Sequence, residues 1–481
     1  MRRWLPLAAV CLGSLMFLLD TTVVAVALPD VARSFGASLR GLQWVANGYT
    51  LVLAVAMLPA GAYADRYGAR RVHLLGLAVF ALASLACGFA PGTGALIAAR
   101  AVQGLGGAAL AVTAFALIAH TYRGRAMASA MSVWGAVTGL GAAAGPMAGG
   151  VLTQYLGWRA IFFVNLPLTA LAVALTLRSL PSGPSGPGET PAPGEGPRQR
   201  IVDPVGTCLF AVVAAALTDG LTTAGTDGWH SARAIAGLPA SAVALVAFVV
   251  VELRRDRPLL DLRLFARPLF GTVLACVLAS SVAFACLIYT SIWLQSGLGL
   301  SPARTGLALV PMALATFVTS AVPARLPRAL PPRHGIGAGL LLSAVGCALQ
   351  SGLDAGSGPS SITLGLAVTG VGVGLLIPAS GVVLSAVPAD RRGMAAGASM
   401  TVRQLGQTLG VAVLGALFTA SLPGTPANAS SHAAHAHALA RALDHVYLAA
   451  AAVGLAGALL AFVSLRRRPD DRGSGALLEG A

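Results

Sequence analysis

The chain has 481 residues, of which 56% are hydrophobic and only 10% are charged, and its mean hydropathy is +0.78. This composition excludes a soluble globular protein and is typical of a protein that crosses a membrane several times. All 32 basic residues are arginines spread along the chain, so the net charge of +15 does not indicate a nucleic-acid-binding surface, and the lack of lysine excludes a phosphate-binding P-loop.

The first apolar run, residues 5–29, contains a single charged residue, Asp20. The run is long enough to cross a bilayer, which takes about 20 residues of helix. A carboxylate inside the bilayer costs about 2.5–3.5 kcal/mol on insertion scales, unless it faces a protein-lined or water-filled interior. We therefore interpret Asp20 as a group that handles protons or ions, or that binds a charged ligand. The alternative is a structural acid paired with a neighbouring helix.

Fourteen apolar segments are able to span a membrane, which predicts an all-α integral membrane protein with 14 transmembrane helices. With the N-terminus inside, twenty-four arginines fall in the inner loops and ends and six in the outer ones. Because positively charged loops stay in the cytoplasm, we expect a cell-membrane protein with both termini cytoplasmic. The segments are 5–29, 43–64, 73–90, 94–119, 126–152, 158–178, 203–224, 233–253, 269–295, 303–323, 335–353, 361–387, 394–420 and 443–465.

An internal repeat divides the chain into similar halves. The run that begins at Arg123 matches the run that begins at Arg392, and both enter a predicted span. This predicts two six-helix bundles in a pseudo-two-fold arrangement, with two helices inserted between them, although chance similarity between Ala/Gly-rich helices is the alternative. The expected division is an N-terminal bundle 1–180, a flexible cytoplasmic linker 181–202, two inserted helices 203–253, a C-terminal bundle 254–465 and a cytoplasmic tail 466–481.

Three glycine- or charge-containing motifs lie in the first half of the chain. In the loop after span two, glycine permits close helix approach and a tight turn, and the acid can pair with arginine or cap a helix N-terminus. In span five, glycines recur every four residues on one helix face, and a proline bends the helix. The loop contains Gly61, Asp65, Arg66, Gly68, Arg70 and Arg71, and span five contains Gly141, Gly145, Pro146, Gly149 and Gly150.

Span four contains an arginine, Arg100, followed by Gln103. An arginine this far inside a span must be paired or face water. It lies toward the same half of the membrane as Asp20, so the two side chains can meet if spans one and four are neighbours. A static ion pair is the alternative to a role in proton transfer.

These motifs resemble those of the major facilitator superfamily. Residues 61–71 resemble its G-x-x-x-D-R-x-G-R-R/K signature, with Ala69 in place of one basic residue. The resemblance implies that this loop is a latch that closes the inner side of the protein, and that Arg100, in an R-x-x-Q-G motif, takes part in proton transfer with Asp20. The glycine–proline set of span five resembles the motif of exporters that work by antiport. Residues 19–29 resemble the signature of the fourteen-span drug:proton antiporters, with Ala25 in place of the usual asparagine.

Other polar residues within the spans are weaker candidates. The run of His432, His435 and His437 suggests a metal site, but a polar loop is favoured, and we expect no metal. The six cysteines are scattered singly and indicate neither disulfides nor a metal site. Six polar residues are expected to line a substrate cavity: Asn47, Tyr49, Gln103, Trp134, Asn165 and Arg403.

Together these features predict a secondary active exporter, driven by proton entry, of small amphipathic or cationic molecules such as an antibiotic. An uptake symporter of the same fold and a non-transporting membrane receptor or scaffold are the alternatives. An enzyme is not expected, because the sequence has no nucleophile–base set and no nucleotide loop. The expected partners are a drug-like small molecule, protons and the lipid bilayer, without cofactor or nucleic acid, and we expect a monomer.

Overall fold

The computed structural model of the protein describes residues 4–180, 203–255, 262–266, 268–321, 332–354, 356–379, 392–422 and 432–465. Every regular element in these residues is helical, as the sequence predicts. The predicted linker 181–202 and tail 466–481 lie outside the described residues, as does the side chain of Asp65.

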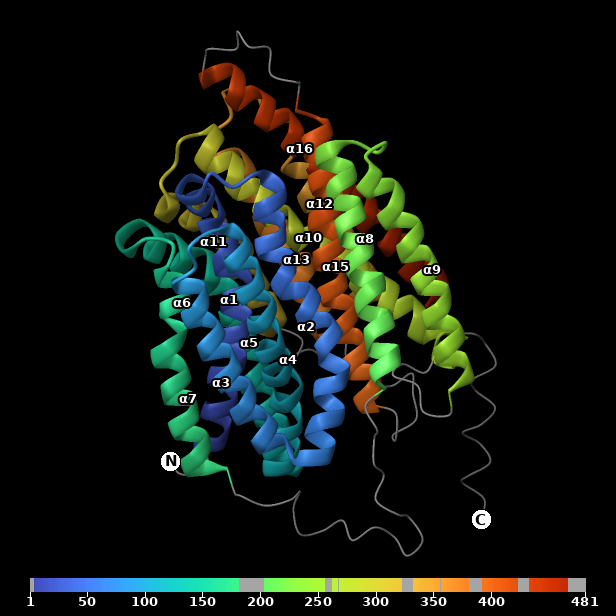
Figure 1. Cartoon of the computed structure of the whole chain (residues 1–481). Helices are drawn as coiled ribbons and strands as arrows, with labels where there is room; N and C mark the ends of the chain where they lie inside the picture. Colours follow the sequence, from blue (N-terminus) through green and yellow to red (C-terminus); the bar gives the residue numbers. More distant parts are fainter. Residues whose placement is uncertain are drawn as a thin grey trace, which may run out of the picture.

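The helices of the first third of the chain pack on one another (Figure 1). Within this group, α2 and α3 both pack on α4, and α1 packs on α5 and α7. Each of the short turns between them leaves too little chain for anything but antiparallel neighbours. The elements are α1 (Leu5–Phe35), α2 (Leu39–Tyr67), α3 (Ala69–Gly88), α4 (Thr93–Thr121), α5 (Gly124–Leu156), α6 (Ala160–Phe163) and α7 (Asn165–Ser179).

A second group of helices forms from the last part of the chain. Here α10 packs on α15 and α16, and α12 packs on α13 and α16. The 3₁₀ helix η2 (Leu262–Ala266) precedes the group. Its members are α10 (Pro268–Ile292), η3 (Trp293–Gly297), α11 (Pro302–Ala321), α12 (Pro332–Leu349), η5 (Pro359–Ile362), α13 (Thr363–Ala379), α15 (Arg392–Ala420) and α16 (His432–Ser464).

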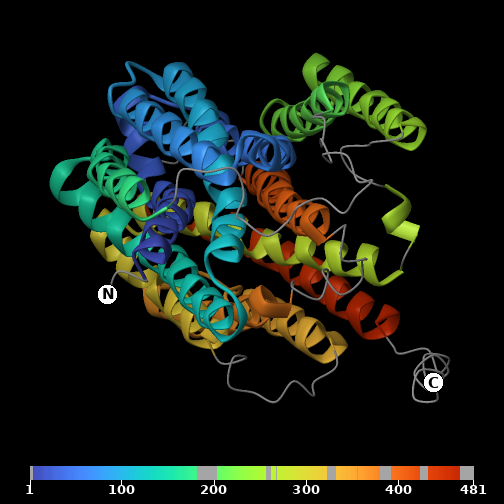
Figure 2. The same ribbon diagram turned by 90° about the horizontal axis from the view of Figure 1, so that it is seen from below.

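The helices α8 (Pro204–Asp227) and α9 (Ala232–Arg254) form a hairpin outside both groups. Seen along the helix axes, the hairpin lies at the edge of the molecule, where α8 packs on α2 and α15 (Figure 2). Arg40 at the start of α2 is paired with Asp219 at 2.8 Å and with Asp227 at 3.3 Å, both on α8. The residues between the two groups therefore form a separate helical unit, in the position in the chain where the sequence predicts two inserted helices.

The repeated runs of sequence occupy equivalent positions in the two groups. The first repeat begins α5, which packs on α1 in its own group and on α11 in the other. The second begins α15, which packs on α10 in its own group and on α2 in the other. The two repeats thus supply the helices at which the groups meet, one on each side of the molecule.

All fourteen predicted spans contain helix, but the exact count of fourteen membrane crossings is not confirmed. Among the described residues, eleven helices are long and apolar enough to cross a membrane, and twelve if the bent α5 is counted as one span. The apolar part of α12, Arg333–Leu349, is short. The helix α15 carries Arg403, Gln404 and Gln407, which lower its apolar character.

Helix ends differ from the predicted ends of the spans. The first span was predicted to end at Pro29, but α1 continues through this proline to Phe35. Residues 432–442, predicted as an outer polar loop with the histidine run, form the first turns of α16. The predicted loop at the histidine run is wrong, because a helix can continue with polar residues beyond the end of an apolar run. For the same reason the end of the first apolar run did not mark the end of α1.

Candidate functional site

Asp20 is completely buried in the middle of α1 and accepts hydrogen bonds from three side chains. One carboxylate oxygen, Oδ1, accepts from Gln103 Nε2 at 2.9 Å and from Asn165 Nδ2 at 3.2 Å. The other, Oδ2, pairs with Arg100 Nη1. The carboxylate is therefore held from α4 and α7 by two amides and one guanidinium, which provide the hydrogen bonds that a buried charge requires.

Arg100 on α4 is 1% exposed and is fixed by several contacts. Its Nε donates to the carbonyl oxygen of Val45 at 3.3 Å, and its Nη1 donates to Gln103 Oε1 at 2.7 Å. Its guanidinium carbon lies 4.2 Å from the centre of the Tyr49 ring, in the geometry of a cation–π contact. The structure thus brings Asp20 and Arg100 together and surrounds them with Tyr49, Gln103 and Asn165.

Ser84 on α3 completes the network and was missed from the sequence. Its hydroxyl oxygen accepts from Gln103 Nε2 at 2.9 Å and from Asn165 Nδ2 at 3.2 Å, so it orients both amides toward Asp20. A single serine in an apolar helix gives no signal in the sequence that separates it from a packing residue.

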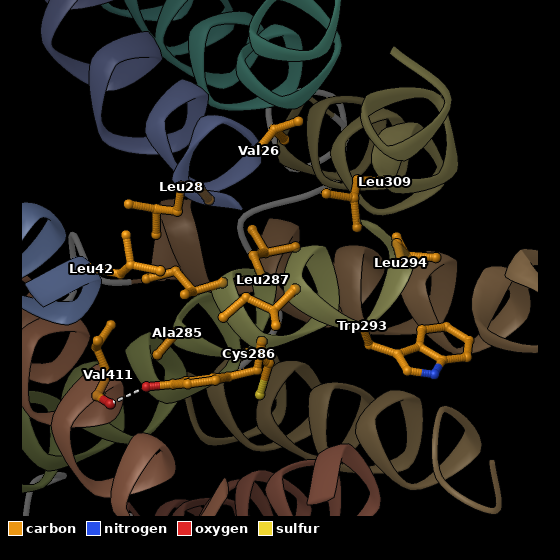
Figure 3. Close-up of a cluster of buried hydrophobic side chains, with 14 of the residues drawn as sticks. Val26, Leu28, Leu42, Ala285, Cys286, Leu287, Trp293, Leu294, Leu309 and Val411 are labelled. Carbon is orange, nitrogen blue, oxygen red and sulfur yellow. Dashed lines mark hydrogen bonds between the residues drawn. The ribbon is translucent and has the colours of Figure 1, made fainter. Parts of the chain in front are cut away.

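A cavity of about 50 Å³ lies next to this network, between the two groups of helices. Arg100 lines the cavity, whereas Asp20 lies behind it and is not among the lining residues. The lining from α10 and α15 is mostly apolar, and Figure 3 shows Ala285, Leu287 and Val411 within the buried cluster on that side. The full lining is Thr21, Thr22, Val24, Ala25, Ala46, Asn47, Thr50, Arg100, Phe284, Ala285, Leu287, Ile288, Gln407 and Val411.

Of the six residues predicted to line a substrate cavity, Asn47 lines this one. Tyr49, Gln103 and Asn165 belong instead to the network around Asp20 and Arg100, because a buried ion pair needs polar partners and these side chains supply them. Trp134 donates from Nε1 to Ser14 Oγ at 2.9 Å and so joins α5 to α1. Arg403 is half-buried on α15 and is not among the lining residues.

The predicted latch lies at the turn between α2 and α3. Gly68 has φ +91°, a backbone conformation that favours glycine, so the expected tight turn is confirmed. Gly61 was expected to permit close helix approach, but among the described residues a Cβ atom there would meet nothing within 4 Å. The described part of the chain therefore shows no close helix contact at Gly61. Arg66 lies 5.3 Å over the Tyr67 ring, and Arg66 and Arg71 are exposed, while Arg70 is half-buried.

Three glycines of α5 line a close contact with another helix, as the sequence predicts, and the structure shows that this helix is α1. A Cβ atom on Gly149 would lie 2.6 Å from the carbonyl oxygen of Val23, and one on Gly145 would lie 3.2 Å from the Val23 nitrogen. Gly141 likewise faces Leu15, whereas Gly150 faces Pro302 at the start of α11.

Pro146 stands where α5 bends. The helix bends by 41° between Ser129–Gly141 and Ala144–Leu156. The missing N–H of Pro146 leaves the carbonyl of residue 142 without its helical donor, which places the bend one turn before the proline. On the other side of α5, Gly306 of α11 packs against the Pro146 carbonyl, so this bend lies at the contact between the two groups of helices.

A membrane protein with two groups of helices, a buried acid–arginine pair and a central cavity between the groups has the architecture of a secondary transporter. The chain belongs to the Major Facilitator Superfamily, whose family model matches residues 10–410. It is accordingly a multi-pass membrane transporter and not an enzyme.

Curated relatives match over most of the chain. One is the multidrug resistance protein Stp of Mycobacterium tuberculosis, 37% identical over 88% of this chain and 77% of the relative. Another is the puromycin resistance protein of Streptomyces alboniger, 35% identical over 98% of this chain and 92% of the relative. A third is the tetracenomycin C resistance and export protein of Streptomyces glaucescens, 34% identical over 86% and 76%.

Solved structures share the fold. A bacterial homologue of the human lysosomal transporter Spinster, in an inward-facing and unoccupied conformation, superposes with a TM-score of 0.65 at 19% identity, over 97% of this chain and 99% of that chain. A peptide transporter in complex with sulfate gives 0.64 at 16% identity, over 94% and 93%.

Proposed function

We propose that this protein is a proton-coupled exporter of small amphipathic molecules such as antibiotics, acting in the cell membrane as a monomer with both termini in the cytoplasm. The proposal includes fourteen membrane crossings, with two six-helix bundles related by the sequence repeat and the α8–α9 hairpin inserted between them. The names of the curated relatives, which describe resistance and export, support the direction of transport.

The position of Arg100 is the observation that supports coupling most directly. One side of this residue pairs with Asp20, and another lines the cavity. Protonation of Asp20 removes the charge that holds the guanidinium, whereas a cargo that interacts with the guanidinium competes with the carboxylate for it. Proton and cargo therefore act on the same side chain, from opposite sides.

The hydrogen bonds around Asp20 favour two distinct states: one in which Arg100 pairs with the ionised Asp20, and one in which Asp20 is neutral and Arg100 has a new partner. With Asp20 ionised, its charge is balanced by Arg100 and its oxygens accept three donors. Breaking a buried ion pair by neutralising one partner typically costs about 3–5 kcal/mol, so a rearrangement that gives Arg100 a new partner is strongly favoured. In the proposed cycle the cargo leaves outward, Asp20 takes up a proton, and the protonated protein returns.

The energy supplied by one proton is sufficient for useful export. Moving one charge through a membrane potential of 100 mV yields about 2.3 kcal/mol, which supports a concentration ratio of about fifty-fold. The α2–α15 and α5–α11 contacts join the two groups of helices, and the cavity between the groups holds only about 50 Å³. In the proposed cycle a drug-sized cargo therefore enters only when the groups move apart.

Inside-out membrane vesicles test the proposal. Vesicles from an expressing strain, energised by respiration, are expected to accumulate a resistance-panel compound, and a protonophore is expected to abolish the accumulation. Accumulation that survives the protonophore would remove proton coupling. Loss of the compound from energised inside-out vesicles, in place of uptake, would instead favour the symporter.

A further inference from the structure

The charges around the cavity indicate which class of cargo it accepts. Among the described lining residues, Arg100 is the sole charged side chain, and none is a carboxylate. The nearby acid, Asp20, lies behind Arg100 and already accepts three donors. A cationic cargo would therefore meet a guanidinium without a carboxylate to balance its charge, and this arrangement disfavours it.

Two carboxamides in the lining have unused hydrogen-bonding capacity. Asn47 is completely buried, and neither its Nδ2 nor its Oδ1 has a hydrogen-bond partner among the described residues. Gln407 is half-buried, and its Oε1 is also without a partner. Polar atoms in such positions are normally satisfied in a folded protein, so unsatisfied ones that line a cavity point to a ligand that supplies the partners.

Asn47 and Gln407 come from opposite groups of helices and are close together. Asn47 lies on α2, one turn before Thr50, and Gln407 is adjacent to Thr408 on α15. The hydroxyl oxygens of Thr50 and Thr408 are 2.8 Å apart. A single small molecule in the cavity therefore reaches a carboxamide of each group, in addition to Arg100.

We propose that the cargo is an uncharged or anionic molecule with carbonyl and hydroxyl groups, recognised by the Asn47 and Gln407 carboxamides and by the side of Arg100 that lines the cavity. This inference rests on the proposed export function and specifies its substrate class. Gln407 becomes a specificity-determining residue that sequence reasoning did not find. Lipophilic cations, which the sequence left open as cargo, are poor substrates in this arrangement.

Two xanthene dyes of similar size but opposite charge test the proposal. Energised inside-out vesicles are given fluorescein, which is anionic, or rhodamine 6G, which is cationic, and the initial uptake rates are compared. We expect fluorescein to be transported at least tenfold faster. Three outcomes would overturn the substrate class but leave export in place: equal rates for the two dyes, faster transport of rhodamine 6G, or transport of other compounds but not of fluorescein. Transport of neither dye and of no compound in a resistance panel would contradict the export function itself.

Placing an acid in the cavity is expected to reverse the preference. Asn47→Asp and, independently, Gln407→Glu should raise rhodamine 6G transport at least fivefold and lower fluorescein transport. Asn47→Leu removes the hydrogen-bonding groups without adding charge. It should lower the rate of fluorescein transport and leave the rate of rhodamine 6G transport unchanged.

The control for these variants is Gln350→Glu. Gln350 is a buried amide at the end of α12 and does not line the cavity, so this variant adds a buried acid away from the proposed site. It should leave the dye preference as in the parent protein. If either cavity acid folds, as judged by its melting temperature, and leaves the preference unchanged, the assignment of that residue is wrong. An equal gain of rhodamine 6G transport in the control would show a general charge effect and would also overturn the assignment.

Discussion

The Thr50 hydroxyl on α2 and the Thr408 hydroxyl on α15 lie 2.8 Å apart and join the two groups of helices at the edge of the cavity. One turn further along α2, the Thr401 hydroxyl donates to the Ala54 carbonyl at 3.2 Å, so the contact continues along both helices. If the groups separate during transport, these contacts must break. The distance between the two threonine side chains is therefore a direct measure of the proposed movement.

A reversible cross-link between these positions should stop transport. In a background without the six native cysteines, Thr50→Cys with Thr408→Cys is expected to form a disulfide on oxidation, because the replaced oxygens are already in contact. Uptake into inside-out vesicles should fall more than tenfold and recover when dithiothreitol is added. Either single cysteine variant is the control, and its transport rate should be the same under oxidising and reducing conditions. A cross-linked protein that transports at the normal rate would show that α2 and α15 do not separate there.

Neutralising Asp20 should remove coupling. Asp20→Asn retains two hydrogen-bonding atoms but leaves Arg100 as an unbalanced buried cation, so both transport and stability should fall. We expect the loss of stability to reach about 3–5 kcal/mol, the usual effect of removing one partner of a buried ion pair. Uptake against a gradient should fall by at least tenfold.

The double variant Asp20→Asn with Arg100→Gln separates the two effects. Because the double variant carries no unpaired charge, its melting temperature should recover most of the loss, whereas uptake should remain abolished. If uptake recovers together with stability, the ion pair has a structural role and the alternative raised from the sequence, a structural acid, is correct.

The charged residues of this site were the ones that the sequence indicated most clearly, although Asn47 was also predicted to line the cavity and does so. Asp20 and Arg100 stand out because a charge in an apolar helix is costly and needs an explanation. Ser84 and Gln407 do not stand out, since uncharged polar residues are tolerated in spans. Asn165 was recognised as a polar group but placed in the cavity, because the sequence does not tell which side of a helix faces the neighbouring acid.

Some features of the fold were likewise predicted well from the sequence and others poorly. Hydrophobic length predicted where helices occur, and the glycine spacing of α5 predicted a close contact with another helix, which the structure identifies as α1. Helix ends were predicted less well, since α1 passes through Pro29. The pairing of Arg40 with Asp219 was not predicted, because it joins residues far apart in the sequence.

The turn between α2 and α3 should depend on Gly68 and tolerate a change at Gly61. Gly68 has φ +91°, and a residue with a side chain in such a conformation costs about 1–3 kcal/mol. We therefore expect Gly68→Ala to lower the melting temperature in detergent. Gly61→Ala is the matched comparison, because its Cβ would meet nothing within 4 Å. Equal stability of the two variants would contradict the role assigned to the turn.

Close contact between α5 and α1 should make Gly149 intolerant of replacement by a larger residue. The Cβ of Gly149→Ala would lie 2.6 Å from the Val23 carbonyl oxygen, and a backbone atom cannot turn aside as a flexible side chain does. Overpacking of this kind costs about 1–3 kcal/mol, so the variant should melt at a lower temperature and transport more slowly. Gly135→Ala on the same helix is the control, because a Cβ there meets nothing within 4 Å. That variant should keep its stability and its transport rate, and a loss of similar size in both variants would mean that helix flexibility, and not the α1 contact, is what these glycines provide.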